Sequence, residues 1–142
     1  MPRPQRNRIV STPPKMIGFK PYGLKKCKSE NIVLTFDEFQ GFKYINYDEL
    51  NQELAAAKMD ISRPTFTRLY NRALKKIALA FVEGKTIIIE GGDVRFENEW
   101  LRCLKCYKLI DGKTTHIRCA NCMLYGTNEL VNIVKPVDKK NN

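Results

Sequence analysis

Residues 51–81 read NQELAAAKMDISRPTFTRLYNRALKKIALAF, and this stretch decides the fold that we predict. Asn51 and Ser62 are good N-caps, because their side-chain oxygens can accept hydrogen bonds from free amides at a helix start. The sequence therefore predicts a short helix over 52–59 and a longer one from Ser62 to about Phe81. Two helices joined by such a tight turn form a helix-turn-helix, whose second helix can enter the major groove of DNA.

The longer helix is amphipathic, and its polar face is basic. Its inward stripe is Phe66, Leu69, Tyr70, Ala73, Ile77 and Ala80, at the spacing of one helix face. Its outward face carries Arg63, Thr65, Thr67, Arg68, Asn71, Arg72 and Lys75. We expect the early members to read base edges, since Arg and Asn pair with guanine and adenine there. Arg72, Lys75 and Lys76 come later, where phosphates are the expected partners.

Two resemblances support this interpretation. The residues SRPTFTRLYNRALKKI, from Ser62 to Ile77, resemble the recognition helix of bacterial sigma factor region four and related regulators. A wider resemblance over residues 1–92 is to an uncharacterised prokaryotic family of predicted DNA-binding proteins. The similar segments are MPRP at 1–4, FKP at 19–21, VLTFDE at 33–38, QELAAAKM at 52–59 and GKTIIIEGG at 84–92. This resemblance implies a sigma-region-four-like fold and implies no particular target.

A further helix is predicted before the pair. Thr35 stands three residues before Glu38, the capping-box spacing that satisfies two free amide donors at a helix start. Phe36, Phe39, Phe42 and Ile45 then recur every three residues, as an apolar stripe of a short helix. Together with the pair, this helix completes a predicted three-helix DNA-binding domain over residues 31–83.

The segment before this domain, residues 1–30, is rich in proline and basic residues. Residues 1–28 contain eight Lys or Arg and no acidic residue. Prolines restrict the backbone and remove amide donors, so we predict an extended arm. Arg3, Arg6 and Arg8 could bind phosphates or the minor groove, as basic arms do. A solvated tail is the alternative, and the sequence leaves both open.

The segment after this domain contains a strand and then paired cysteines. An isoleucine-rich strand over 85–90 and a connector occupy residues 84–100. CLKC at Cys103 to Cys106 is followed after 12 residues by CANC at Cys119 to Cys122. Two such pairs can close a tetrahedral four-sulfur site, so we predict a structural zinc-ribbon-like module over residues 101–135, with iron as the alternative metal. Residues 136–142 are predicted to be a disordered tail.

The composition of the chain limits which kinds of function are plausible. The chain has 142 residues and a formal net charge of +10, which favours a polyanionic partner. One histidine, no nucleophile elbow, no phosphate loop and no paired buried carboxylates argue against an enzyme. The sequence shows neither a membrane span nor a signal peptide, so we expect a cytoplasmic protein without a membrane partner.

Together these patterns predict a mainly α fold: a three-helix helix-turn-helix with a basic arm, followed by a small β zinc module. The predicted function is sequence-specific binding of double-stranded DNA by a transcription regulator. One alternative is an adaptor of the transcription machinery whose zinc module docks on RNA polymerase or another protein. RNA binding is a second alternative, and the sequence leaves open whether the chain forms a homodimer.

Overall fold

The computed structural model describes residues 7–25, 30–104, 107–111 and 130–133. Contacts divide the chain into two compact units, residues 1–97 (unit 1) and residues 98–142 (unit 2). The segments predicted as an arm, a helical domain and a strand with connector all contribute to unit 1. Each unit is described by itself.

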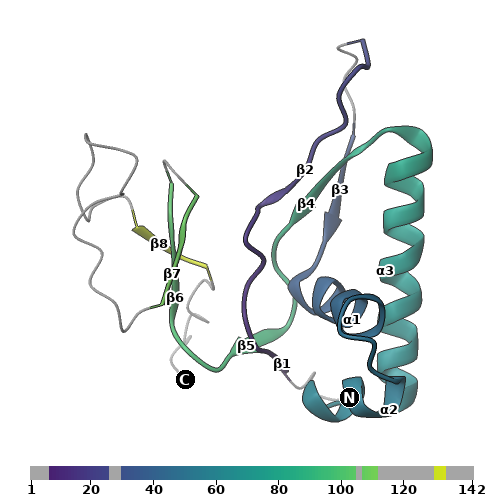
Figure 1. Ribbon diagram of the computed structural model, residues 1–142, viewed down its shortest axis with the longest axis vertical. Coiled ribbons are helices and arrows are strands. Elements are labelled where there is room, and N and C mark those ends of the chain that lie inside the picture. The colour runs from purple at the N-terminus through teal and green to yellow at the C-terminus, as the bar shows by residue number, and fades with distance from the viewer. Residues whose placement is uncertain (1–6, 26–29, 105–106, 112–129, 134–142) are drawn as a thin grey trace, which may run out of the picture. The chain divides into compact units, whose positions relative to one another are not determined.

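Unit 1 contains three helices at the predicted places (Figure 1): α1 over Phe36–Asn46, α2 over Gln52–Lys58 and α3 over Arg63–Glu83. Each begins where the sequence predicts a cap. The amide of Leu54 donates to the Asn51 side chain at 2.8 Å, and the Ser62 hydroxyl accepts from the Thr65 amide at 3.4 Å. The predictions of helix positions are therefore confirmed.

Unit 1 also contains two small sheets. In the larger sheet, β4 (Thr86–Ile89) lies between β2 (Gly18–Phe19) and β3 (Asn31–Leu34), antiparallel to β2 and parallel to β3. The smaller sheet pairs β1 (Arg8–Val10) with β5 (Val94–Phe96) in parallel. Ile87 and Ile89 of β4 are buried, and α3 packs beside β3 and β4.

The prediction of a mainly α, three-helix fold is wrong. In the part of the chain that the structure describes, three helices stand with eight strands in three sheets, and these residues give no support for a helix-turn-helix assignment. The physical reason is backbone pairing. An apolar strand such as β4 cannot leave its amides and carbonyls unpaired, so segments before α1 supply its two neighbours. The predicted extended arm therefore contributes sheet edges.

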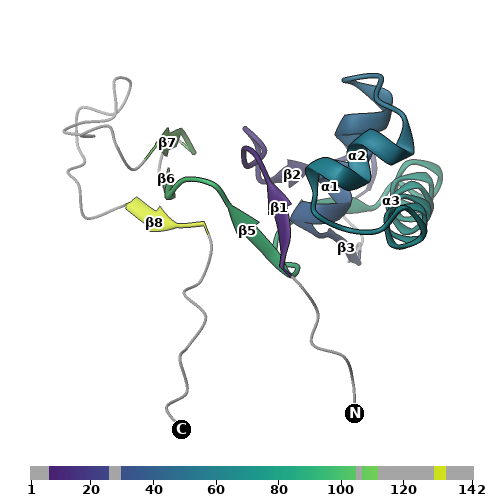
Figure 2. The same cartoon turned by 90° about the horizontal axis from the view of Figure 1, so that it is seen from below.

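The helical core of unit 1 lies where the three helices meet. Its buried members are Tyr44, Ala55, Ala56, Met59, Phe66 and Leu69. The small side chains of α2 let α3 approach closely, so Phe66 is completely buried. Seen from below, α1 lies between α3 and β1 (Figure 2). This packing fixes which side of α3 faces outward.

The described part of unit 2 is a three-stranded antiparallel sheet. Its central strand is β6 (Trp100–Cys103), flanked by β7 (Leu109–Asp111) and β8 (Leu130–Asn132). Among the residues that the structure describes, none of the helices combines the length and apolarity needed to cross a membrane.

Candidate functional site

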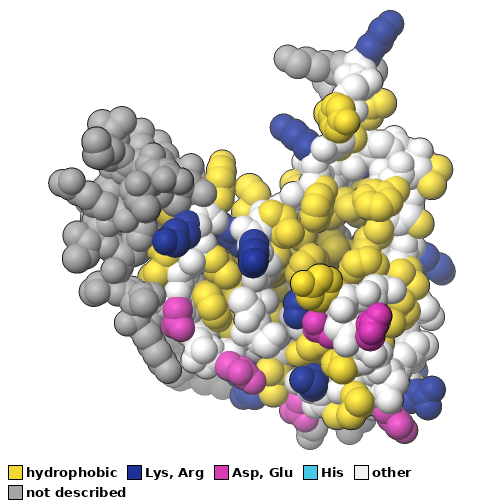
Figure 3. All heavy atoms as spheres, viewed as in Figure 1, with side chains coloured by type: hydrophobic (Ala, Val, Ile, Leu, Met, Phe, Trp, Pro, Cys, Tyr) yellow, Lys and Arg dark blue, Asp and Glu magenta, His cyan; other side chains and the backbone are white. Residues whose placement is uncertain are grey.

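The outward side of α3 carries a cluster of cations, which we call the α3 basic face: Arg63, Arg68, Arg72 and Lys75. All four side chains are exposed. The helix contains no acidic residue before Glu83, its last residue, so no acid offsets this charge along the stretch of α3 that carries the four cations. Within the described residues, no ion pair is found for Arg63, Arg68 or Lys75, while Arg72 contacts one buried carboxylate. Figure 3 shows Lys and Arg along the lower part of the edge that α3 forms.

The α3 basic face projects outward because the opposite side of the helix is buried. Phe66, Leu69 and Ala73 are completely buried against the rest of unit 1. The Phe66 ring stacks on the Tyr70 ring, with their centroids 6.2 Å apart. The side-chain amide of Asn46 on α1 donates a hydrogen bond to the Tyr70 hydroxyl at 3.2 Å. The orientation of α3 is therefore set by packing.

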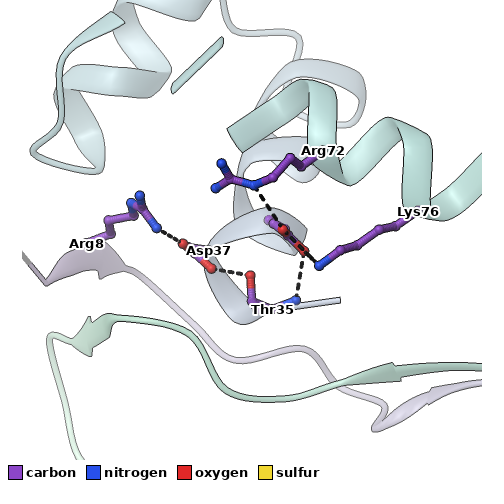
Figure 4. Close-up of polar contacts among 6 residues, drawn as sticks. Arg8, Thr35, Asp37, Arg72 and Lys76 are labelled. Atoms are coloured by element: carbon purple, nitrogen blue, oxygen red, sulfur yellow. Dashed lines mark hydrogen bonds and ion pairs between the residues drawn. The ribbon is translucent and has the colours of Figure 1, made fainter. Parts of the chain in front are cut away.

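Glu38, at the start of α1, pairs with Arg72 and Lys76 and so ties α3 to α1 electrostatically; Figure 4 labels Arg72 and Lys76 on α3 and Thr35 beside α1. The side chain of Glu38 is only 4% exposed, and it accepts hydrogen bonds from Lys76 Nζ at 2.7 and 3.0 Å. Arg72 Nε lies 3.5 Å from the same carboxylate, and the Thr35 amide donates to it at 3.1 Å. Lys76, predicted from the sequence to bind phosphate, is thus held against a buried acid.

Asp37 makes the second contact of this region (Figure 4). Its buried carboxylate pairs with the guanidinium of Arg8 and accepts a hydrogen bond from the Thr35 hydroxyl. Arg8, predicted to lie in the DNA-binding arm, is therefore placed in β1 beside α1. Arg3 and Arg6 lie outside the described residues.

The remaining predicted DNA-binding residues of α3 fall into two groups. The hydroxyls of Thr65 and Ser62 lie 2.8 Å apart at the start of α3, whereas Thr67 donates to Gln52 and so links α3 to α2. Asn71 is exposed beside the basic face. Asn71 is thus the polar side chain best placed to accompany the four cations.

Sequence reasoning missed the ion pairs of Glu38 and Asp37. It gave Glu38 only a capping-box role beside Thr35 and gave Asp37 no partner. Their partners, Lys76 and Arg8, are 38 and 29 residues away, and no local pattern indicates such pairing. The capping-box spacing at Thr35 was the one available signal that this helix start is highly organised.

Cys103 is the one predicted metal ligand that the structure describes. It is buried at the end of β6. Its amide donates to the Lys108 carbonyl at 3.1 Å, and its carbonyl accepts from the Tyr107 amide at 2.9 Å, which closes a tight hairpin. Tyr107 adopts a left-handed φ of 59° in this turn.

Cys106, Cys119 and Cys122 lie outside the described residues. Among those that are described, no three His, Cys, Asp or Glu side chains stand close enough to hold a metal. Next to Cys103, the Arg102 guanidinium donates to the Tyr107 carbonyl at 3.1 Å. Burial lowers the pKa of Arg102 from its ordinary value.

Comparisons with known proteins identify relatives of this chain. The family model described as "Protein of unknown function DUF134" matches residues 1–97. A UPF0251 protein of Chloroherpeton thalassium is 43% identical over 106 residues, covering 75% of this chain and 70% of that protein. A UPF0251 protein of Clostridium acetobutylicum is 38% identical over 135 residues, covering 92% of this chain and 91% of the relative.

A third relative, a UPF0251 protein of Clostridium botulinum, is 38% identical over 125 residues, covering 86% of this chain and 79% of that protein. No solved structure matches the chain. The family match covers unit 1, and with it the α3 basic face and the ion pairs of Glu38 and Asp37. The chain therefore belongs to the DUF134 family of proteins of unknown function.

Proposed function

We propose that this protein binds double-stranded DNA through the α3 basic face and acts as a transcription regulator in the cytoplasm. The observation that carries the proposal is a helix with four exposed cations and no acid before its last residue. Such a surface attracts a polyanion. Binding, rather than catalysis, is the proposed activity.

The dimensions of α3 suit a duplex. A helix of 21 residues is roughly 30 Å long at 1.5 Å per residue. The major groove is about 12 Å wide and admits one helix. The buried contacts of Phe66 and Leu69 hold α3 rigidly, so little conformational entropy is lost when its outer side meets DNA.

The proposed roles within the face differ. Arg68 and Asn71 lie on the outward side of the first half of α3, where they can reach base edges. Arg63 and Lys75 stand towards the two ends of the face, where phosphates are the expected partners. Lys76 is given no DNA contact in this proposal, because its ammonium already binds Glu38.

The test is DNA binding by the purified chain, measured by fluorescence anisotropy over a range of salt concentrations after selection of preferred duplexes from random sequence. Lys75→Ala should weaken binding to all sequences and lower the salt slope by about 1. Arg68→Ala should relax base preference at one position by about 1–3 kcal/mol.

Lys20→Ala is the matched control, because it removes the same charge from an exposed residue outside α3. If Lys20→Ala and Lys75→Ala weaken binding equally, the α3 basic face is not the binding surface. If the chain ignores duplex DNA at low salt, the proposal fails. Tighter binding to RNA of the same sequence would favour the RNA alternative.

We also propose that Cys103, Cys106, Cys119 and Cys122 bind one structural zinc ion. The burial of Cys103 at the start of a tight hairpin supports it, since thiolates of structural zinc sites are shielded from water. Elemental analysis should find one zinc per chain in the wild-type protein and none in Cys103→Ser. Iron in place of zinc, or no metal, would contradict the proposal.

A further inference from the structure

The second half of α3 is apolar on a side that faces solvent. Its large exposed members are Leu74 (37% exposed), Phe81 (76%) and Val82 (86%), and Ala78 between them is exposed as well. We call these four residues the α3 apolar seam. Figure 3 shows hydrophobic side chains at the upper, C-terminal end of the α3 edge. Large aromatic and aliphatic side chains left this open on one helix indicate a protein partner.

The seam has the spacing of a helix-packing surface. Leu74, Ala78 and Phe81 are four and three residues apart, which keeps them on one side of the helix, as in a coiled-coil seam. Val82 flanks this line. No charged residue falls between Lys76 and Glu83, so the seam offers nothing to an acidic or basic partner. The partner must present a matching apolar helix.

We propose that the partner is a second copy of this chain, whose α3 packs antiparallel on the seam about a two-fold axis near Ala78. In this arrangement Leu74 and Val82, each four residues from Ala78, face one another between copies, and Phe81 lies at the level of Lys75 of the other copy, whose aliphatic stem and ammonium can cover the ring. The small Ala78 lets the two helices approach closely at the axis. A two-fold dimer uses the same surface on both copies.

Charge selects the antiparallel arrangement. A parallel pair would bring the two α3 basic faces alongside one another, with four cations in each. The antiparallel pair moves Arg63, Arg68 and Arg72 of the two copies towards opposite ends of the dimer, while Lys75, three residues before Ala78, stays near the two-fold axis. It also sets the two helix dipoles in opposition, which is the favourable orientation for side-by-side helices.

The size of the seam sets the strength of the dimer. With Leu24 (59% exposed) against Gly84 at the C-terminal end of the seam, the apolar surface available is on the order of 500 Å² per copy, below the roughly 800 Å² per partner of a standard interface. The dimer should therefore dissociate on dilution.

One consequence rests on the proposed DNA binding. The middle of the α3 basic face is about ten residues before Ala78, so the two faces lie roughly 30 Å apart along the paired helices at 1.5 Å per residue. Half-sites one turn of DNA apart are separated by about 34 Å. At 100° per residue, Arg68, Arg72 and Lys75 are rotated by roughly 60–120° from Ala78, all in the same direction, so both faces can meet the same side of a duplex.

The first test is sedimentation equilibrium of the full chain without DNA, over protein concentrations from about 1 to 200 μM. The average mass should rise from 16.5 kDa towards twice that value with concentration. Phe81→Glu and Val82→Glu should each abolish the rise. Tyr47→Glu is the matched control, because Tyr47 is equally exposed (79%) and stands after α1, away from the seam.

A monomer at every concentration would overturn the inference, and so would a dimer that survives both substitutions. Circular dichroism would confirm that the variants stay folded, which is expected because Phe81 and Val82 face solvent.

The second test examines the orientation by disulfide cross-linking. Under mild oxidation, Ala78→Cys should form a disulfide between copies at position 78, identified by mass spectrometry of peptides. Asn71→Cys should form none at position 71, because antiparallel packing moves the two copies of residue 71 far apart. Cross-linking at both positions would show a parallel pair and overturn the proposed arrangement.

These tests separate the dimer from DNA binding. If Phe81→Glu remains monomeric and still binds a single half-site, both proposals hold. If the wild-type chain is a dimer and ignores DNA, the proposed function alone fails. If the chain binds DNA and never self-associates, the dimer alone fails.

Discussion

Glu38 shows at the scale of one residue how this protein holds a charge in its interior. Its carboxylate is shielded from water, yet it receives an ammonium, a guanidinium and a backbone amide from three separate positions. A buried charge without such partners would cost several kcal/mol. One residue thus joins the start of α1 to the middle of α3.

Glu38→Gln tests this arrangement. Gln keeps an acceptor for the Thr35 amide, as capping boxes allow, and removes only the negative charge. We expect the free energy of unfolding to fall by about 2 kcal/mol, because hydrogen bonds to charged groups contribute roughly 1.5–3 kcal/mol each and Lys76 is partly hydrated. Urea denaturation measures the change. Asp48→Asn, which breaks the exposed pair with Lys43, should cost under about 0.5 kcal/mol, and an equal loss in both variants would contradict this account.

Gly92 is constrained both by its backbone and by its neighbours. It adopts a left-handed φ of 97°, and a Cβ built there would lie 2.7 Å from Asp37 Oδ1 and 3.0 Å from Thr35 Cβ. Gly91 is also left-handed, with a φ of 72°, but its Cβ would meet nothing within 4 Å. The two glycines therefore separate backbone strain from steric overlap.

We expect Gly91→Ala to lower the free energy of unfolding by about 1 kcal/mol, the usual cost of a left-handed residue with a side chain. Gly92→Ala should cost about 2 kcal/mol more, because overlap with Asp37 also disturbs its pair with Arg8. Thermal denaturation of both variants is the measurement. Equal losses of stability in the two variants would mean that Thr35 and Asp37 move aside for the new methyl group at no energetic cost.

At the scale of an element, α1 buries three polar side chains: Asp37, Glu38 and Gln40. Besides its two paired acids it buries Gln40, which is 0% exposed, and neither amide atom of that side chain finds a hydrogen-bond partner among the described residues. Burying an amide without a partner costs about 1–3 kcal/mol. The helix therefore stays in place through its apolar residues and its paired acids, despite Gln40.

Replacing Gln40 by methionine should raise the free energy of unfolding by about 1 kcal/mol, because Met has nearly the same shape and no group to leave unpaired. Chemical denaturation with a single transition gives the value. Gln40→Ala is the comparison, and it should be destabilising because it leaves a cavity. A loss of stability in Gln40→Met would show that the amide has a partner in solution.

At the scale of the whole molecule, the chain consists of two compact units. Unit 1 has its own buried core around Phe66 and Met59. Unit 2 is small, and its described sheet includes Cys103 as a buried residue. Units of this size need metals or disulfides to reach useful stability.

We therefore expect calorimetry of the full chain to show two transitions. A strong zinc chelator, or Cys103→Ser, should lower the transition of unit 2 and leave that of unit 1 within about 2 °C, a shift worth under 1 kcal/mol for a domain of this size. A fragment of residues 1–97 should reproduce the unit 1 transition. A chelator that shifts both transitions equally would contradict this division.

The positions of the helices could be predicted from sequence, whereas the fold class could not. Helix starts are local: Asn51 and Ser62 each accept from the amide three residues ahead, so their effect is visible in the sequence. The pairing of β2 and β3 with β4 joins segments more than 50 residues apart, and no local pattern shows it. The error in fold class came from this long-range pairing.

The sequence by itself determined the caps, the inward stripe of α3 and the absence of acid along its outer side, because all three follow from residue order and helix geometry. Tertiary structure alone decided which cations stay free. Lys76 and Arg8 became internal partners of Glu38 and Asp37, while Arg63, Arg68 and Lys75 remained outside. The physical reason is that a buried carboxylate needs a cation beside it, so it pairs with whichever cation the fold brings close. That cation can come from any position in the sequence.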